Sequence, residues 1–210
     1  MKQQLHKTTI SDFVKFNAYE GGKKYRVLTN ANSEEVGIEL RGRLTTFDMK
    51  NANGYKFKSD SYDKYVDEYF IANSLNVPVC LLHDDTDIRN LCGKVTEMVK
   101  NDDGIDIVVN VPKCSYYYNL IKGHIDAGVL QGFSNYGGLV AGWYDDEDDS
   151  LVIEKFQLLH AALVCNPGDT TATFDTVADT KFVGFDPRNA EVVENNDKSL
   201  DEDSDIYAIV

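Results

Sequence analysis

A pair of strand-like stretches joined by a tight turn constrains the fold of this chain most. Residues 91–99 and 105–111 are short runs rich in apolar and β-branched side chains, which is typical of strands with a buried face. Asn101-Asp-Asp-Gly104 stands between them and has the residue types that favour a reverse turn. We therefore expect the two stretches to pair as an antiparallel hairpin.

The rest of the chain repeats this pattern of short strands, interrupted by two helices. A helix is predicted where Tyr62, Tyr65, Val66, Tyr69 and Phe70 recur at the helical period. The other expected strands cover 36–44, 77–82, 139–144, 151–164 and 181–185, and the two helices cover 59–74 and 115–127. The pattern predicts a mostly β fold with flanking helices: a closed or nearly closed, mostly antiparallel barrel with the helices outside.

Three regions differ in composition along the 210 residues. Residues 1–35 form a mostly polar N-terminal segment, residues 36–185 carry the strands of the folded domain, and residues 186–210 are acidic with few core-forming side chains. The last region is predicted to be a disordered tail. It ends in an apolar cluster, Ile206-Tyr-Ala-Ile-Val210.

The net charge of −14 excludes some classes of partner. A nucleic-acid-binding protein needs a basic face, and an anionic membrane surface would repel so acidic a chain. No apolar run reaches the ~20 residues of a membrane span, and the N-terminus lacks the apolar core of a signal peptide. We expect a protein of the cytoplasm that binds neither nucleic acid nor membrane.

The four cysteines, Cys80, Cys92, Cys114 and Cys165, are scattered without a Cys-x-x-Cys pair. Zinc sites usually need such closely spaced ligands. We therefore expect no metal site and no cofactor, and we interpret all four cysteines as reduced and structural.

One segment, Gln131-Gly-Phe-Ser-Asn-Tyr-Gly-Gly138, holds a single serine between glycines. Glycine permits sharp turns and close approach of a ligand, so Ser134 could present its hydroxyl in a cleft. Such segments are more often ordinary turns. A nucleophilic serine also needs an adjacent base.

Two histidines lie in strands, where they could supply that base. His83 ends an apolar run and precedes two aspartates, so it is either a solvated strand-end residue or a general base. His160 lies in an apolar strand, where it is either a hydrogen-bonded core residue or the group that orients the base. His124 is interpreted as a packing residue of the second helix.

The order His83, Ser134, His160 resembles that of the prohead (capsid maturation) proteases of tailed phages, serine peptidases similar to herpesvirus assemblin. The matching motifs are Gly42-Arg-Leu-Thr-Thr-Phe47, Ser61-Tyr-Asp-Lys-Tyr65, Val79-Cys-Leu-Leu-His-Asp84, Cys92-Gly-Lys-Val95, Gly132-Phe-Ser134 and Leu159-His-Ala-Ala-Leu-Val-Cys-Asn-Pro167. Position 160 is a histidine where many members of the family carry an acid, and assemblin-like enzymes use a Ser-His-His set.

The resemblance implies an assemblin-like barrel and a serine endopeptidase of capsid maturation. Ser134 would be the nucleophile, His83 the base and His160 the third residue, with backbone N–H groups of Asn135 and Tyr136 as candidate oxyanion donors. It also implies action inside the assembling procapsid in the host cytoplasm. Partners would be the major capsid protein and the scaffold protein, with cleavage of the protease itself and self-association as a homodimer or larger assembly.

Two alternatives stay open at this point. One is a catalytically inactive scaffold or assembly protein of the procapsid with the same fold. The other is a cysteine hydrolase that uses Cys114 or Cys165.

Overall fold

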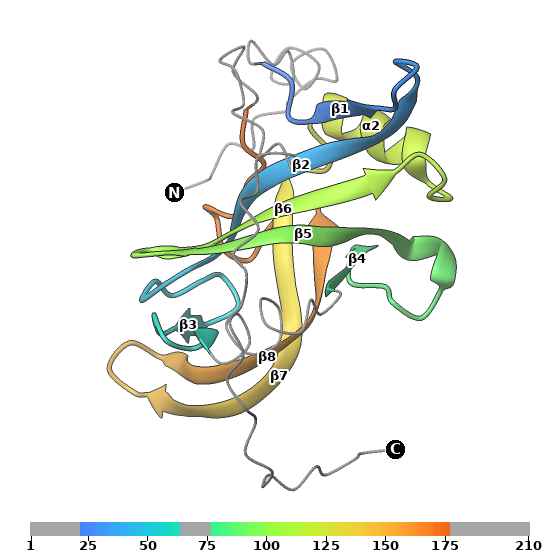
Figure 1. The fold of residues 1–210 in the computed structure, drawn as a ribbon. Coiled ribbons are helices and arrows are strands. Elements are labelled where there is room, and N and C mark those ends of the chain that lie inside the picture. The colour runs from blue at the N-terminus through green and yellow to red at the C-terminus, as the bar shows by residue number, and fades with distance from the viewer. Residues whose placement is uncertain (1–21, 64–76, 177–210) are drawn as a thin grey trace, which may run out of the picture. The chain divides into compact units, whose positions relative to one another are not determined.

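The computed structural model describes residues 22–63 and 77–176, all within one compact unit, Met1–Asp179. In chain order the elements are β1 (Arg26–Thr29), β2 (Glu35–Thr46), β3 (Tyr55–Phe57), β4 (Val77–Leu81), the 3-10 helix η2 (Ile88–Asn90), β5 (Leu91–Asn101), β6 (Gly104–Pro112), α2 (Tyr118–Asp126), β7 (Gly132–Asp145) and β8 (Ser150–Val164) (Figure 1). Most of the helix expected over 59–74, the strand expected over 181–185 and the tail 186–210 lie outside the described residues. A mostly β fold is confirmed.

The hairpin expected around the Asn101–Gly104 turn is present as β5 and β6. The two strands pair antiparallel from Lys94 opposite Asn110 to Asn101 opposite Gly104. Side chains of β6 such as Ile105, Ile107 and Val109 are buried and supply part of the core. The turn chemistry and the apolar runs therefore predicted this element correctly.

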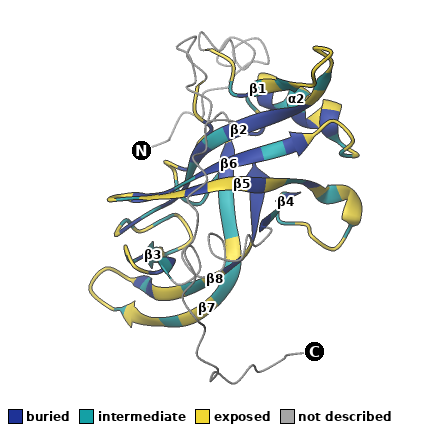
Figure 2. Ribbon diagram, in the orientation of Figure 1, coloured by how far each residue is buried: buried dark blue, intermediate teal, exposed yellow. Residues whose placement is uncertain are grey.

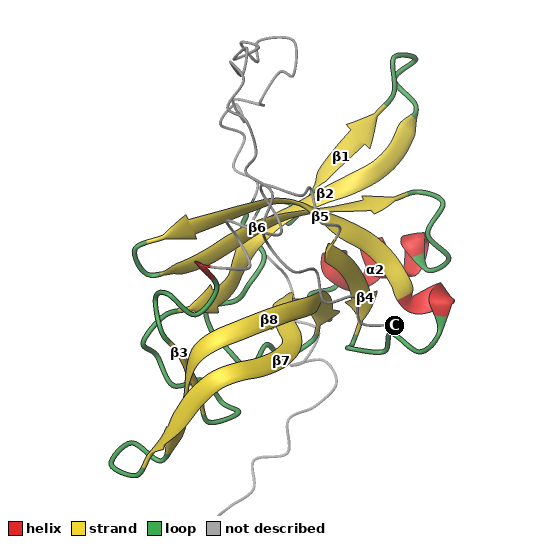
Figure 3. Ribbon diagram, turned by 60° about the horizontal axis from the view of Figure 1, so that its bottom comes forward, coloured by secondary structure: helices red, strands yellow, loops and turns green. Residues whose placement is uncertain are grey.

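Eight strands form one sheet, in the order β1-β2-β6-β5-β4-β8-β3, with β7 beside β8. Most neighbours are antiparallel, while β3 and β4 each run parallel to β8. In Figure 3 the sheet dominates, and α2 is the α-helix of the described part of the chain. The short strands β1 and β3 were not predicted from the sequence.

The expected closed barrel is not confirmed, because no continuous ladder joins β7 to β2. Instead, the segment 172–175 forms isolated bridges to both strands, between Gly42 and Phe174 and between Gly132 and Thr173. A Cβ on Gly132 would lie 1.9 Å from the carbonyl oxygen of Ala172. The backbone approaches so closely here that only glycine fits.

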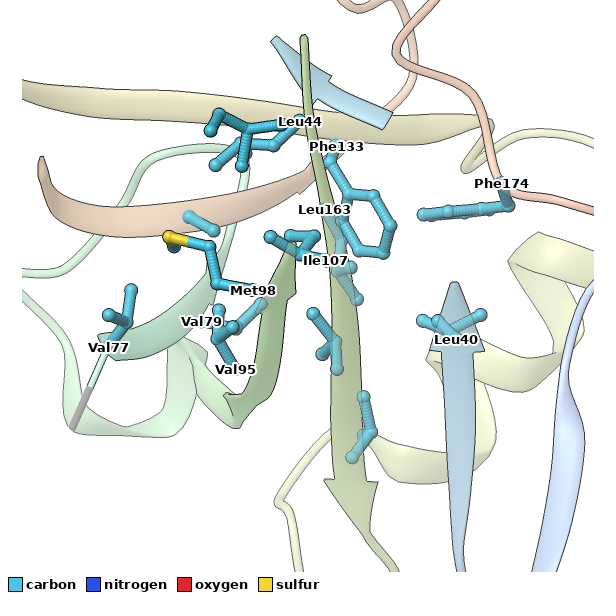
Figure 4. Packing of buried hydrophobic residues seen from close by; sticks show 14 of the residues in the cluster. Leu40, Leu44, Val77, Val79, Val95, Met98, Ile107, Phe133, Leu163 and Phe174 are labelled. Atoms are coloured by element: carbon cyan, nitrogen blue, oxygen red, sulfur yellow. The ribbon is translucent and has the colours of Figure 1, made fainter. Parts of the chain in front are cut away.

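The core lies on the inner face of this sheet (Figure 4). Phe133 and Phe174, which are both almost fully buried, meet edge to face with ring centroids 4.9 Å apart. Such an aromatic pair adds about 1 kcal/mol beyond its buried area. The pair of Phe133 and Phe174 packs the segment that follows β8 against the start of β7, next to Ser134.

The helix expected over 115–127 is α2, and its buried face is not centred on His124, which was interpreted as a packing residue. Tyr118, Ile121 and Ile125 are buried, whereas Leu120 is exposed and His124 only partly buried. The backbone carbonyl of His124 accepts hydrogen bonds from the N–H groups of Val129 and Leu130 and so ends the helix.

The long β7–β8 hairpin corrects the expectation of a serine loop before residue 139. The strand begins at Gly132, so Ser134 lies within β7 and pairs opposite Ala162. The far half of β7 is largely exposed (Figure 2), whereas Ser150, Val152 and Ile153 at the start of β8 are buried. No helix in residues 22–63 and 77–176 is long and apolar enough to cross a membrane.

Candidate active site

Ser134 lies on the face of β7 opposite the core. Successive strand residues point to opposite faces, and its neighbour Phe133 is fully buried in the core. Ser134 is partly exposed. Its side chain makes no hydrogen bond with another residue of the described part of the chain, so the hydroxyl is available to a further partner.

The strand register brings Ser134 into a row with residues of two neighbouring strands. Ala162 of β8 pairs with Ser134 on one side and with Cys80 of β4 on the other. One step along the sheet, on the same face, Tyr136 pairs with His160. The small side chain of Ala162 thus separates the serine from the end of β4.

His83 follows β4 in a tight turn that carries it back toward this face. Leu82 and His83 both have left-handed backbones, with φ of 52° and 62°, and the N–H of Asp84 donates to the carbonyl of Leu81 at 2.9 Å. Two left-handed central residues define a type I′ turn, which usually carries glycine or asparagine. A leucine in this conformation costs about 1–3 kcal/mol, so the turn is held by its surroundings.

The two candidate histidines are in direct contact. His83 Nδ1 lies 3.3 Å from His160 Nε2. The ring of Tyr136 stacks on that of His160 with centroids 4.6 Å apart and an interplanar angle of 13°. His160 is only 3% exposed. The two histidines are 77 residues apart in the sequence, and they come into contact because β4 pairs with β8.

The surroundings of both imidazoles favour the neutral form. Burial lowers the pKa of His83, and the neighbouring His160 lowers it further. Burial also lowers the pKa of His160, although the nearby Asp85 carboxylate acts in the opposite direction. A neutral imidazole can accept a proton, which is what a general base must do.

Asp85 was not singled out from the sequence. Its Oδ2 lies 3.3 Å from Nδ1 of His160, with the Asp85 side chain 52% exposed. The sequence His83-Asp84-Asp85 places two carboxylates next to the histidine, but it does not indicate which of them contacts His160. Asp84 instead accepts hydrogen bonds within its own loop, from Thr86 and Asn90.

The backbone N–H groups near Ser134 differ in direction. The N–H of Phe133 donates to the carbonyl of Ala172 rather than to β8. Because N–H directions alternate along a strand, the N–H of Asn135 lies on the same side as that of Phe133. The N–H of Tyr136 lies on the side facing β8, where Tyr136 pairs with His160.

Other candidate residues lie elsewhere. His124, in α2, makes no contact with His83 or His160 among the described residues. Cys80 and Cys92 are buried, and burial raises the pKa of their thiols to about 11 and about 12. Cys114 is exposed and Cys165 partly buried. Across residues 22–63 and 77–176, no group of three His, Cys, Asp or Glu could hold a metal ion.

The fold was compared with those of known proteins. No protein-family model matches the sequence, and no curated protein matches it. Among solved structures, the chain is similar to the bacteriophage T4 capsid assembly protease, gp21, with a TM-score of 0.52 and 13% sequence identity over 68% of this chain and 92% of that chain. The chain therefore has a fold like that of a phage capsid assembly protease. The further likeness to herpesvirus assemblin stays a prediction.

Proposed function

We propose that this protein is a serine endopeptidase of phage capsid maturation. The observation that carries the proposal is the contact between His83 and His160 on the face of the sheet that presents Ser134. A partly exposed serine, two neutral imidazoles in contact and the fold of a capsid assembly protease together favour acyl transfer over other chemistries.

Ser134 is the nucleophile in this proposal, and its Oγ attacks the scissile carbonyl. Its proton passes to Nε2 of His83, because Nδ1 of that ring is engaged by His160. The imidazolium of His83 then donates the proton to the leaving amine, and His160 orients the ring throughout. Water hydrolyses the acyl-enzyme by the same proton transfers in reverse, and no cofactor takes part.

The hydroxyl of Ser134, which has no hydrogen-bond partner among the described residues, is compatible with these roles. Hydrogen bonds between catalytic groups are often long in the absence of substrate and tighten when it binds. Ala162 of β8 pairs with Ser134 on one side and with Cys80 of β4 on the other. The strand that leads to His83 is therefore only one strand away from that of Ser134. We expect a bound substrate to exclude water from this face, so that the Ser134 hydroxyl donates its hydrogen bond to the imidazole of His83.

The backbone N–H groups of Asn135 and Tyr136 remain the proposed oxyanion donors. Their directions indicate which of the two is better placed to donate. The N–H of Asn135 lies on the side of β7 facing away from β8, where a tetrahedral oxyanion could accept from it. Tyr136 would contribute only if its pairing with His160 loosens. We therefore place the first donor at Asn135.

The proposed substrates are the scaffold protein, or a scaffold-like segment of the major capsid protein, and the protease itself. The T4 protein acts, by its name, in capsid assembly, and this chain would act in the same place, inside the procapsid in the host cytoplasm. Self-association as a homodimer or larger assembly would keep activity low while the protein is dilute.

A fluorophosphonate probe tests the proposal, because it reacts covalently with activated serines. The wild-type protein should be labelled, and the Ser134→Ala and His83→Ala variants should not. His124→Ala is the matched control, since it removes an imidazole outside the site and should leave labelling unchanged.

Other outcomes identify the alternatives. Labelling that persists in Ser134→Ala contradicts the assignment. An iodoacetamide-sensitive activity that is lost only in Cys114→Ala or Cys165→Ala would indicate the cysteine hydrolase. Absence of both labelling and self-cleavage in the folded wild type would favour the inactive assembly protein.

A further inference from the structure

The contacts of His160 continue beyond His83 to a third side chain. Asp85 Oδ2 lies 3.3 Å from His160 Nδ1 on one side, and His83 Nδ1 lies 3.3 Å from His160 Nε2 on the other. Each ring nitrogen of His160 therefore has one titratable partner. The three groups form a line from the half-exposed Asp85 carboxylate through His160 to the imidazole of His83.

The chemistry of the carboxylate decides where the protons lie. An ionised carboxylate only accepts hydrogen bonds, so Asp85 favours the tautomer in which His160 carries its proton on Nδ1, 3.3 Å from Asp85 Oδ2. A neutral imidazole has a single N–H, so His160 Nε2 is bare and accepts from the Nδ1–H of His83. His83 Nε2 is then bare as well, and it is the atom that must accept the proton of Ser134.

The neighbouring aspartates of this loop bind partners within the loop, whereas Asp85 contacts His160. Asp84 accepts hydrogen bonds from the N–H and Oγ1 of Thr86 and from Asn90. Asp87 caps η2 and forms an ion pair with Arg89. The aspartates on either side of Asp85 thus hold the loop, whereas Asp85 reaches His160.

We propose that Asp85 is a positioning residue that sets the tautomer of His160 and, through it, the tautomer of His83. It acts without touching substrate. This inference rests on the proposed function for its consequence in catalysis, whereas the tautomers themselves do not depend on it. As His83 gains the proton of Ser134, the carboxylate also stabilises the positive charge through His160.

Replacement by alanine tests the tautomers directly. A free imidazole in water prefers the Nε2–H form, so His160 should change from the Nδ1–H to the Nε2–H tautomer in Asp85→Ala. In molecules with that tautomer, His83 would accept from His160 at Nδ1 and carry its own proton on Nε2, so the fraction of His83 with a bare Nε2 for Ser134 would fall. Nitrogen-15 chemical shifts of the two rings, measured in the full chain, report both changes without any turnover.

The rate of fluorophosphonate labelling gives the catalytic consequence. Because the Asp85 carboxylate is about half exposed, solvent screens its charge and the loss should be moderate, about tenfold in labelling rate. Asp85→Glu should restore part of that rate by returning the carboxylate. Asp84→Asn is the control, since it removes a charge from the same loop and should leave both tautomers unchanged.

The outcomes separate this inference from the proposed function. An Nδ1–H tautomer of His160 that persists in a folded Asp85→Ala variant overturns the role of Asp85, whatever the activity. Wild-type-like labelling of Asp85→Ala overturns it too. A wild-type protein that the probe does not label would instead count against the proposed peptidase, while the nitrogen shifts would still decide the role of Asp85.

Discussion

Replacing Gly132 with alanine should disrupt the junction that places Ser134. A Cβ at this position would lie 1.9 Å from the carbonyl oxygen of Ala172 and 2.8 Å from Cγ of Pro167. A carbon and an oxygen normally approach no closer than about 3.3 Å, so the Ala172 backbone must retreat by about 1.4 Å. The segment that bridges β7 and β2 has to move with it.

The cost follows from the contacts that this movement breaks. The N–H of Phe133 donates to Ala172 at 2.8 Å, and the N–H of Phe174 donates to Gln131 at 2.9 Å. Each such hydrogen bond contributes about 1 kcal/mol to stability. The edge-to-face pair of Phe133 and Phe174 contributes about 1 kcal/mol more. We expect Gly132→Ala to lower the free energy of unfolding by about 3 kcal/mol.

Urea unfolding followed by circular dichroism measures this loss, with Gly138→Ala as the matched control. Gly138 lies in the same strand, and a Cβ there would have no atom within 4 Å, so its substitution should change stability by less than about 0.5 kcal/mol. Equal stabilities of the two variants would refute the reasoning. The rate at which the fluorophosphonate probe labels Ser134 should fall in Gly132→Ala and stay unchanged in Gly138→Ala.

Two further predictions concern the turn and the imidazoles. Leu82→Gly should raise the free energy of unfolding by about 1 kcal/mol in urea titrations, because glycine relieves a left-handed leucine that is 59% exposed; destabilisation would contradict the strain. The pKa values of His83 and His160 are both lowered from 6.5, so the unfolded chain binds more protons below that pH. The contribution of these two rings to stability should be complete at neutral pH and fall as the pH drops below 6.5, and His83→Gln with His160→Gln should flatten this decline. An unchanged slope in the double variant would argue against buried neutral rings.

The sequence predicted the elements whose signals are local. The Asn101–Gly104 turn and the apolar runs beside it identified β5 and β6, and the apolar segments ending at His83 and containing His160 identified β4 and β8. Strands β1 and β3 escaped because they are four and three residues long and carry mixed polar residues. The serine segment looked like a loop because its glycines suggested a turn, whereas Gly132 makes room for the Ala172 backbone.

The candidate site depended on contacts that no local pattern contains. His83 and His160 meet because β4 and β8 run parallel side by side, and the sequence order alone could suggest this pair only through resemblance to a family. Tyr136 stacks on His160 because the register of β7 places them opposite each other. The choice between Asp84 and Asp85 required the turn at Leu82 and His83, whose left-handed backbones have no signature in these residue types.

Co-expression with the major capsid and scaffold proteins of the same virus is the most direct test of the peptidase. Intact masses of all products should show defined fragments of one or both proteins with the wild-type chain. A folded Ser134→Ala variant should leave both proteins full length, because it lacks the hydroxyl that forms the acyl intermediate in this proposal. The same fragments in the presence of Ser134→Ala would contradict the account.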